Sequence, residues 1–425
     1  MTTISLQNLG CSKNAIDGER ILHLFTSNGF THTQECSDAE IIIVNTCAFI
    51  REAQEEAIET ILSMASYKTN GKCSKLIVCG CFSERFRSQA QQKLPEVDIW
   101  TGVNDWQTVL KDIAKSTSVT PSFERTLFEP IATQHLKIAE GCSHHCTFCV
   151  IPSIRGSLKS RTPADILDEA QWLYDKGARE LILVAQDTTR YGKDIGASLV
   201  NLLEKLLAQT RFPWIRMMYL HPNFISDELL ELVASEKRVC SYFDIPLQHI
   251  ADPILTAMNR KPPSSKIYRL IEKIRTKITD SAIRSSFIIG FPGETERHFF
   301  ELTEFIEFAR FDKLGVFPFS PEEGTEAYNL RPRPVNKTVQ RRCDELMTIQ
   351  REISREILES RIGSQMEVII DRVSDDHDFN FEARTRFDAP EVDGRVMIRS
   401  GNFSPGTITK ATIIGASDYD LFADV

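Results

Sequence analysis

The chain of 425 residues lacks any run approaching the roughly 20 apolar residues that a membrane-spanning helix needs. It shows no secretory signal, because its first residues open directly into a strand-like stretch. Basic residues are not in excess: the formal net charge is −9, which argues against general, non-specific nucleic-acid binding. No internal repeat stands out. We therefore expect a cytoplasmic, globular protein of about three domains.

Cysteine, by contrast, is plentiful, with 11 residues. In a cytoplasmic chain this number indicates metal or redox chemistry rather than disulfides. Cys142, Cys146 and Cys149 have a C-x-x-x-C-x-x-C spacing, close enough to surround one metal centre. Thiolates are the ligands of iron–sulfur clusters, and three of them leave one iron of a four-iron cluster open to a small molecule. A zinc site would more often use paired C-x-x-C modules, and His144 and His145 are more often hydrogen-bonded loop residues than ligands.

Residues 1–115 alternate strand-like and helix-like stretches, which indicates a parallel α/β sheet with helices on its faces. The expected strands are Ile4–Leu9, Glu40–Asn45, Lys75–Cys79 and Val97–Gly102. Cys11, Cys47 and Cys81 follow the first, second and third of these strands. Because ligands lie beyond the carboxyl ends of the strands in open α/β sheets, the three thiols could converge and hold a second cluster. They could instead be buried structural cysteines, and Cys79 competes with Cys81; we choose Cys81 because Cys79 still belongs to the strand.

Residues 116–133 contain Ser, Thr and Pro without periodicity, and we expect a linker there. A second alternation over 134–360 predicts a partial (β/α)6 barrel with chemistry on the loops after its strands, followed by an exit helix. Its expected strands are His135–Glu140, Glu180–Gln186, Trp214–Leu220, Tyr242–Pro246, Ile283–Ile289 and Lys313–Phe319. Short strands separated by turn residues then predict a small antiparallel β-barrel over 361–425.

With both cysteine sets in view, the whole chain resembles the radical S-adenosylmethionine (SAM) methylthiotransferases. The matching motifs are Leu9–Asn14, Asn45–Cys47, Gly80–Cys81, Glu140–Cys149, Ile151–Gly156, Ser160–Arg161, Pro246–Gln248 and Ile289–Thr295. The resemblance implies an N-terminal domain with an auxiliary cluster, a radical-SAM barrel and a C-terminal TRAM β-barrel. It also implies two 4Fe-4S clusters, one on Cys142, Cys146 and Cys149 with SAM at its open iron, and an auxiliary one on the other three thiols.

Further cofactor contacts are expected at the ends of the barrel strands and in the segment after Cys149. Gln186 and Asp187 end the second barrel strand and are placed to contact SAM, although Asp187 could instead cap a helix. Arg155 and Arg161 could pair with the carboxylate of SAM or of the substrate, or lie on a solvated loop. Gly290 is expected to permit close approach of the adenosine, or only to serve the turn that follows it.

Two branches of this family differ in their substrate. One modifies an adenosine of transfer RNA (MiaB type), and the other modifies the β-carbon of an aspartate in the twelfth small-subunit ribosomal protein (RimO type). The segments that resemble the ribosomal-protein branch are Gly10–Asn14, Gln248–His249, Ser320–Thr325 and Asp388–Gly394, whereas Gly18 and Ala48 depart from its usual pattern. We expect the ribosomal-protein branch, with transfer RNA as the alternative substrate and an iron–sulfur or zinc protein without catalysis as the rival class.

The charge of the C-terminal barrel supports the same choice. From Gly363 to Val425 there are 12 Asp and Glu against 6 Lys and Arg, a net charge of −6. An acidic barrel repels RNA phosphates and suits a basic ribosomal protein, unless the charge only keeps the module soluble. We therefore expect a ribosomal-protein substrate contacted by the TRAM barrel, a protein reductant as electron donor, and neither a membrane nor a nucleic acid as the main partner.

Overall fold

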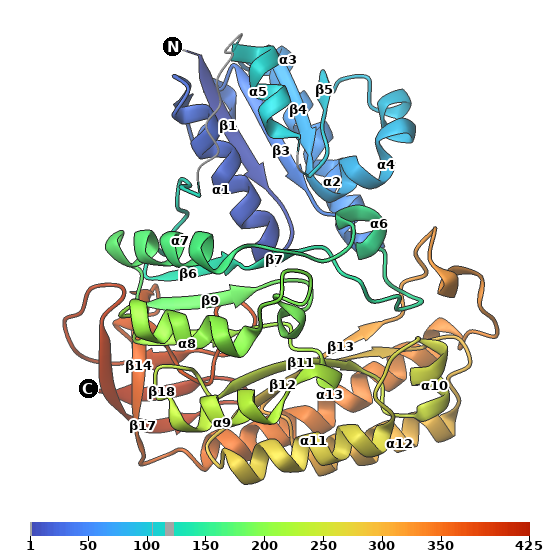
Figure 1. The fold of residues 1–425 in the computed structure, drawn as a ribbon, viewed down its shortest axis with the longest axis vertical. Helices are drawn as coiled ribbons and strands as arrows, with labels where there is room; N and C mark the ends of the chain where they lie inside the picture. Colours follow the sequence, from blue (N-terminus) through green and yellow to red (C-terminus); the bar gives the residue numbers. More distant parts are fainter. Residues whose placement is uncertain (1, 104, 115–122) are drawn as a thin grey trace. The chain divides into compact units, whose positions relative to one another are not determined.

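The computed structural model describes residues 2–103, 105–114 and 123–425. The described residues form two compact units (Figure 1). The first unit comprises Met1–Phe128, Glu140–His144 and Cys149–Lys159, and the second comprises Glu129–Ala139, His145–Phe148 and Ser160–Val425. Residues 116–122 of the expected linker lie outside the described residues. Within the described parts, no helix has the length and apolar character required to cross a membrane.

A parallel sheet with the strand order β2-β1-β3-β4-β5 forms the centre of the first unit. Its strands are β1 Thr3–Asn8, β2 Thr31–His32, β3 Ile41–Thr46, β4 Lys75–Cys79 and β5 Ile99–Trp100. The predicted strands β1, β3 and β4 agree within one residue at each end. The sequence did not predict β2, because both of its residues are exposed and carry no apolar pattern.

Helices cover both faces of this sheet (Figure 1). They are α1 Ser12–Thr26, α2 Arg51–Ala65, α3 Tyr67–Asn70, α4 Gly80–Lys93 and α5 Trp106–Ala114, with a 3₁₀ turn η1 at Cys36–Asp38. Ile42 and Val44 of β3 pack with α2 and α4, whereas Ile41 and Ile43 pack with α1 and α5. Because side chains alternate along a strand, both faces of β3 are buried, which explains its continuous apolar sequence.

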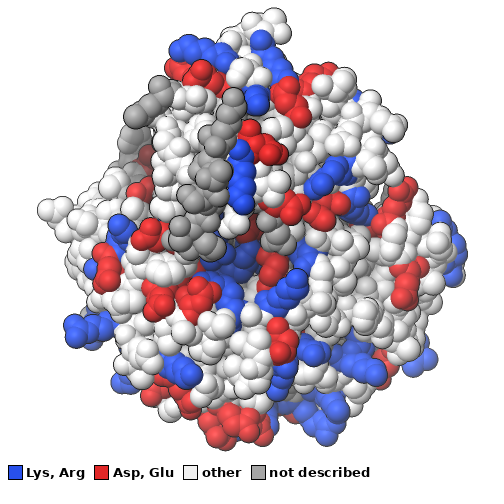
Figure 2. Space-filling view, turned by 45° about the horizontal axis from the view of Figure 1, so that its top comes forward, with Lys and Arg blue, Asp and Glu red and all other residues white. Residues whose placement is uncertain are grey.

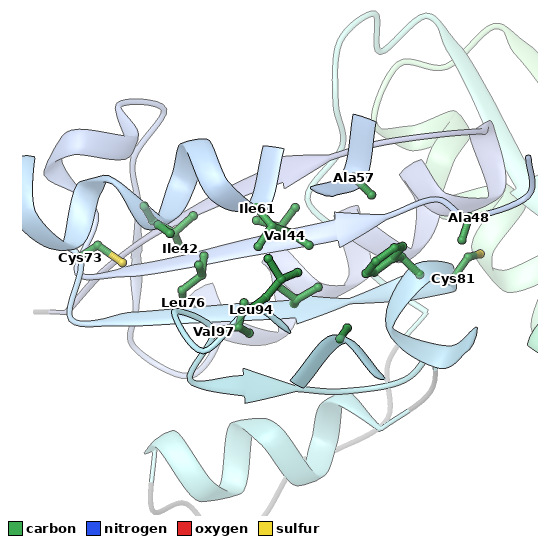
Figure 3. Close-up of a cluster of buried hydrophobic side chains, with 14 of the residues drawn as sticks. Ile42, Val44, Ala48, Ala57, Ile61, Cys73, Leu76, Cys81, Leu94 and Val97 are labelled. Atoms are coloured by element: carbon green, nitrogen blue, oxygen red, sulfur yellow. The ribbon is translucent and has the colours of Figure 1, made fainter. Parts of the chain in front are cut away.

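A short helix from the segment after Cys149, α6 Ile151–Arg155, also belongs to the first unit. Its Ile154 and the preceding Val150 pack into the same core as Ala48 and Cys81. Figure 3 shows this core with Ala48 and Cys81 at one end and Cys73 at the other. The sequence places this segment in the barrel domain, but its apolar side chains are buried with those of the N-terminal sheet.

The second unit contains the predicted partial barrel, formed by parallel sheets of order β10-β9-β6 and β11-β12-β13. The strands are β6 Thr133–Lys137, β9 Glu180–Val184, β10 Trp214–Met217, β11 Tyr242–Gln248, β12 Ala282–Ile289 and β13 Lys313–Pro318. The helices are α7 Pro163–Asp175, α8 Leu199–Gln209, α9 Asp227–Ser235, α10 Asp252–Ala257, α11 Ser264–Lys277, α12 Glu296–Ala309 and α13 Asn336–Glu359, with 3₁₀ turns η2 Thr188–Arg190, η3 Pro222–Phe224 and η4 Glu326–Asn329. The short strands β7 Ala139–Glu140 and β8 Lys159–Ser160 lie where the chain passes from one unit to the other.

The C-terminal strands close into a barrel of order β14-β15-β16-β18-β17. These strands are β14 Gln365–Val373, β15 Phe381–Thr385, β16 Val396–Ile398, β17 Ile408–Ala416 and β18 Leu421–Asp424. The small barrel was predicted as antiparallel, and its other neighbouring strands do pair that way, but β16 and β18 pair in parallel. The chain reverses direction into β17 and again into β18, so β18 runs in the direction of β16.

The small barrel contacts the partial barrel at residues that begin strands. Tyr242, the first residue of β11, donates from its hydroxyl to Asp393 Oδ2 at 2.7 Å, and Lys313, the first residue of β13, pairs with Asp388 at 2.7 Å. Glu180, the first residue of β9, pairs with Arg384 at 2.8 Å. The small barrel therefore lies at the end of the partial barrel opposite to the carboxyl ends of its strands.

Candidate functional site

Cys11, Cys47 and Cys81, called the auxiliary thiols below, follow adjacent parallel strands. Cys11 precedes α1, Cys47 follows β3, and Cys81 lies in the first turn of α4, directly after β4. The strand order places the carboxyl ends of β1, β3 and β4 side by side at one edge of the sheet. Ligands of open α/β sheets bind at such edges.

The auxiliary thiols lie close together. Gly10 has a φ of +89°, and a Cβ placed on it would lie 2.7 Å from the Cβ of Cys47, so the first two loops touch and position 10 requires glycine. Burial raises the pKa of Cys81 to about 11; the Arg155 guanidinium lowers it, and charge on Cys47 and Cys11 raises it. Arg155 Nη2 lies 3.4 Å from Cys81 Sγ and 2.8 Å from Oδ1 of Asn14, which stands three residues after Cys11, so the structure brings the three cysteine loops together.

Cys79, the competitor of Cys81, is the last residue of β4 and is fully buried. Its side chain packs in the core formed with α1 and α5. Its thiol donates to the carbonyl oxygen of Val44 at 3.3 Å, and burial raises its pKa well above the ordinary value. These contacts favour a structural role for Cys79 and Cys81 as the third ligand.

Asn14 forms hydrogen bonds with two of the loops that carry auxiliary thiols. Its side-chain amide donates to the carbonyl oxygen of Leu9 at 2.7 Å and to that of Thr46 at 3.1 Å. Leu9 lies two residues before Cys11, and Thr46 lies directly before Cys47. The sequence included Asn14 in a matching motif without assigning it a role.

Arg155 also lies at the auxiliary thiols. Its Nη2 donates to Cys81 Sγ at 3.4 Å and to Asn14 Oδ1 at 2.8 Å, while its Nη1 pairs with Asp17 at 2.8 Å and Glu140 at 3.0 Å. The sequence suggested that Arg155 pairs with a SAM or substrate carboxylate, or lies on a solvated loop. The structure buries its guanidinium among these partners, which contradicts the solvated loop. A contact with a SAM or substrate carboxylate stays a prediction.

Cys142, Cys146 and Cys149 are called the loop thiols below. Cys142 and Cys149 belong to the first unit, and Cys146 belongs to the second. In the first unit, the N–H of Cys142 donates to the carbonyl oxygen of Gly156 at 2.9 Å, and Cys149 Sγ accepts from the N–H of Ile151 at 3.5 Å. Two of the loop thiols are therefore anchored in the unit that contains the auxiliary thiols.

Cys146 belongs to the second unit, where its neighbours fix the backbone. The backbone N–H of Thr147 donates to the carbonyl oxygen of Met258 at 3.1 Å, and the side chain of Asn259 donates to the carbonyl oxygen of His145 at 2.7 Å. Arg260 Nη1 lies 3.9 Å from Cys146 Sγ. The sequence did not single out Arg260, which lies 114 residues from Cys146.

Gln186 and Asp187, two of the residues predicted to contact SAM, lie shortly after β9. Asp187 Oδ1 accepts the backbone N–H of Thr189 at 3.0 Å and caps the 3₁₀ turn η2, as the alternative interpretation expected. Gln186 is half-buried and lies directly before Asp187, just beyond the carboxyl end of β9. The position of both residues after a barrel strand remains consistent with the predicted cofactor contacts.

Arg161 and Gly290 have structural partners in the second unit. Arg161 pairs with Asp165 and with Glu169, each at 2.6 Å, and these carboxylates occupy its guanidinium. Gly290 has a φ of +81°, and a Cβ placed on it would lie 2.5 Å from Cγ2 of Val339 in α13. These contacts describe how both residues pack within the second unit. A contact of either residue with the cofactor or the substrate stays a prediction.

The residues present fit the predicted iron–sulfur ligation. The auxiliary thiols offer sulfur as the ligand atom, and Arg155 directs an N–H at one of those sulfurs, an interaction typical of cluster sites. Hard cations such as Ca²⁺ and Mg²⁺, by comparison, are bound by carboxylate and carbonyl oxygens. The donor set at the sheet edge therefore suits a soft, thiophilic centre.

Comparisons with known proteins cover nearly the whole chain. Residues 3–102 match the uncharacterized protein family UPF0004, residues 136–306 match the radical SAM superfamily, and residues 362–425 match the TRAM domain. A ribosomal protein uS12 methylthiotransferase RimO from Alkaliphilus oremlandii is 42% identical over 429 residues, which cover 98% of each chain. The protein of that description from Syntrophus aciditrophicus is 42% identical over 100% of this chain and 98% of its own. The one from Geotalea uraniireducens is 41% identical over 99% and 98%.

Solved structures confirm the predicted fold class. The radical S-adenosylmethionine methyltransferase TsrM from Kitasatospora setae superimposes with a TM-score of 0.55 at 13% identity, covering 88% of this chain and 82% of that one. The cobalamin-dependent S-adenosylmethionine radical enzyme OxsB gives a TM-score of 0.51 at 13% identity, covering 83% of this chain and 56% of that one. At these identities the likeness concerns the fold alone.

Proposed function

Because the chain belongs to the family of ribosomal protein uS12 methylthiotransferases, radical-SAM enzymes, we propose that it adds a methylthio group to the β-carbon of an aspartate in uS12. The observation that carries this proposal is the convergence of the loops of Cys11, Cys47 and Cys81 at one sheet edge. A radical-SAM enzyme needs only one cluster to cleave SAM. Insertion of sulfur requires a second metal centre in the same chain, and the auxiliary thiols can bind one.

The radical SAM superfamily implies SAM and a 4Fe-4S cluster, which we assign to the loop thiols. We assign a second 4Fe-4S cluster to the auxiliary thiols. When bound, these groups supply the one-electron chemistry and the methylthio sulfur that an unactivated carbon requires. The chain itself binds the clusters and orients them, and an external protein reductant would supply the electrons.

The residues around the thiols hold the ligand loops in place. Asn14 binds the loops of Cys11 and Cys47 through two backbone carbonyl groups, and the backbone N–H of Cys142 is bound by Gly156. Phe148, next to Cys149 in sequence, packs in the second unit against Met258 and Phe291. This support fixes the ligands before a cluster binds, which lowers the ordering cost of ligation.

For substrate recognition, we propose that exposed acids of the small barrel attract the basic ribosomal protein. The net charge of −6 overstates this attraction, because Asp388 and Asp393 are buried and pair with basic residues of the partial barrel, which the count does not include. The remaining exposed acids include Asp375, Asp376 and Asp378 in the turn between β14 and β15, called the acidic turn below. On the face shown in Figure 2, acidic and basic side chains are interspersed.

The position of the small barrel limits what its acids can do. It contacts the strand starts of the partial barrel, away from the carboxyl ends where the SAM contacts are proposed. The acidic turn would therefore hold a part of uS12 other than the modified aspartate. A ribosomal-protein substrate also places the proposed reaction in the cytoplasm.

Mass spectrometry of uS12 from cells with and without this chain tests the substrate. The proposal expects a methylthio group on one aspartate of uS12 in cells that contain the chain, and none after its deletion. Complementation with a variant that lacks the loop thiols serves as the control and should leave uS12 unmodified. A modification that persists in the deletion strain, or that appears only on transfer RNA, would contradict the proposal.

A further inference from the structure

We propose that Arg155 is a positioning residue of the auxiliary cluster: its guanidinium holds the Cys81 sulfur and connects it, through Asn14, to the loops that carry Cys11 and Cys47. The inference rests on the proposed function, because it takes these three thiols as the ligands of a second cluster. It goes further by assigning a role to a residue outside the cysteine motifs.

The contacts form a continuous path through all three ligand loops. Arg155 Nη2 donates to Cys81 Sγ at 3.4 Å and to Asn14 Oδ1 at 2.8 Å. Asn14 then uses its amide group to donate to the carbonyl oxygens of Leu9 and Thr46, at 2.7 Å and 3.1 Å. One guanidinium and one carboxamide thus reach the loop of every auxiliary thiol.

The guanidinium itself is buried and bound by two carboxylates. Asp17 and Glu140 accept from Nη1 at 2.8 Å and 3.0 Å, and the Arg155 side chain is only 3% exposed. A planar guanidinium can bind carboxylates on one side and direct N–H groups at an amide and a sulfur on the other. The ammonium group of lysine has no such fork, so lysine should reproduce the charge of Arg155 but only part of its geometry.

A charged N–H donor at a ligand sulfur also affects the electronic properties of a cluster. Reduction potentials of iron–sulfur clusters depend on net charge, hydrogen bonds to sulfur and solvent exposure. A positive N–H group next to Cys81 stabilises the reduced cluster, which carries one more negative charge. The effect is strong because the site is buried and the local dielectric constant is low. Loss of Arg155 should therefore shift the potential of the auxiliary cluster to more negative values.

Arg155 also lies next in sequence to the residue that anchors a loop thiol. The carbonyl oxygen of Gly156 accepts the N–H of Cys142, and α6 packs against the core that contains Cys81. A change at position 155 could therefore disturb either cysteine set. The test must measure the auxiliary cluster alone.

A full-length parent protein in which Cys142, Cys146 and Cys149 are all replaced by Ala isolates that cluster. It is reconstituted anaerobically with iron and sulfide, and we compare it with the same protein carrying Arg155→Gln or Arg155→Lys. Iron and sulfide content, circular dichroism and the potential from a titration followed by electron paramagnetic resonance are measured. The matched control is Arg125→Gln, which breaks the buried Arg125–Glu19 ion pair of the same unit and leaves the thiols untouched.

We expect Arg155→Gln to lose iron or to lower the ratio of reduced to oxidised cluster at least tenfold at a fixed potential, equivalent to about 59 mV for a one-electron couple. Arg155→Lys should restore part of this loss, and Arg125→Gln should keep the iron content and potential of the parent. Unchanged iron and potential in both Arg155 variants, or equal losses in Arg155→Gln and Arg125→Gln, would overturn the inference. A parent that binds no cluster would instead refute the second cluster of the proposed function.

Discussion

The side-chain amide of Asn14 donates a hydrogen bond of 3.1 Å to the carbonyl oxygen of Thr46, the residue directly before Cys47. Asn14 itself belongs to the helix that begins directly after Cys11. The conformation of one cysteine loop therefore depends on a side chain from the other. Such contacts hold the two loops close together, as ligation of one centre by Cys11 and Cys47 requires.

Replacement of Asn14 by Ala should weaken the N-terminal unit and its cluster. The carbonyl groups of Leu9 and Thr46 would each lose a donor, and a buried group left without its partner costs about 1–3 kcal/mol. We expect a lower melting temperature of the apoprotein and a lower iron content after reconstitution. Differential scanning calorimetry and iron analysis would measure the two effects.

Asn28→Ala is a suitable control for that variant. Asn28 also donates from its amide to a backbone carbonyl group, that of Leu24 at 2.8 Å, but this contact lies at the far end of α1. It should lower stability only slightly and leave the iron content unchanged. If Asn14→Ala bound as much iron as Asn28→Ala, the proposed support of the ligand loops would be wrong.

Glu180→Gln should destabilise the second unit. The buried Glu180 carboxylate pairs with Arg216 at 2.7 Å and with Arg384 at 2.8 Å, so its neutralisation leaves two buried guanidinium groups short of negative charge. Removal of one partner from such a buried pair costs about 3–5 kcal/mol. Thermal or urea unfolding at pH 7 would measure the loss. Asp418→Asn, which breaks the exposed pair with Arg355, should change stability by about 0–1 kcal/mol.

The same carboxylate gives a pH dependence. Burial raises the pKa of Glu180, but the Arg384 and Arg216 guanidinium groups outweigh it and lower this pKa to about 2. In the unfolded chain a Glu has a pKa of about 4.3, so Glu180 stabilises the fold above that pH and loses this effect as the pH falls towards about 2. The stability difference between the native protein and Glu180→Gln should therefore shrink across this window. A difference that stayed constant would show that the carboxylate is not held in its charged form.

Cys146→Ala should remove the cluster on the loop thiols and leave the auxiliary cluster in place. Without this ligand the cluster on the loop thiols should be lost, whereas the auxiliary thiols remain. The reconstituted protein should then contain roughly four iron atoms in place of roughly eight. SAM cleavage, measured as 5′-deoxyadenosine formation, should cease. A variant that still cleaved SAM would contradict the assignment of Cys146, and one that bound no iron would contradict a separate auxiliary cluster.

Charge reversal in the acidic turn should slow binding of uS12. With Asp375, Asp376 and Asp378 replaced by Lys, we expect the association rate constant to fall about tenfold at low salt, since exposed charges mainly affect the encounter step. The difference should diminish as salt screens the charges. Stopped-flow or surface-based kinetics with purified uS12 would measure both effects.

The control for this variant reverses an equal number of exposed charges elsewhere in the second unit. Glu272, Glu304 and Glu307 lie exposed on α11 and α12, and their replacement by Lys changes the net charge by the same amount. Equal loss of binding in the two triple variants would indicate a response to net charge alone, and recognition by the acidic turn would be refuted.

Much of the architecture could be predicted from the sequence, because the alternation of strands and helices sets the positions of the thiols. The spacing of β1, β3 and β4 indicated that Cys11, Cys47 and Cys81 could meet at one edge, and the resemblance to the methylthiotransferases led to their assignment as ligands. Gly80 begins α4 directly after β4, which places Cys81 rather than Cys79 beyond the strand. These features depend on local patterns and on the general geometry of parallel sheets.

The supporting contacts could not be predicted, because they join residues far apart in sequence. Arg155 lies 74 residues from Cys81 and 141 residues from Asn14, and no periodic pattern connects them. The packing of α6 into the first unit was missed for the same reason, since its partners Ala48 and Cys81 lie far from it in sequence. The close approach of Val339 to Gly290 was likewise hidden, because the two residues lie far apart in sequence.

Cys47→Ala tests most directly whether the chain uses two thiol-bound centres with different tasks. Purified, anaerobically reconstituted variant and native enzyme would be incubated with SAM, reductant, sulfide and uS12, and both 5′-deoxyadenosine and modified uS12 would be quantified by mass spectrometry. We predict that the variant still forms 5′-deoxyadenosine but yields no methylthiolated uS12. Methylthiolation at the native level by Cys47→Ala would contradict the account.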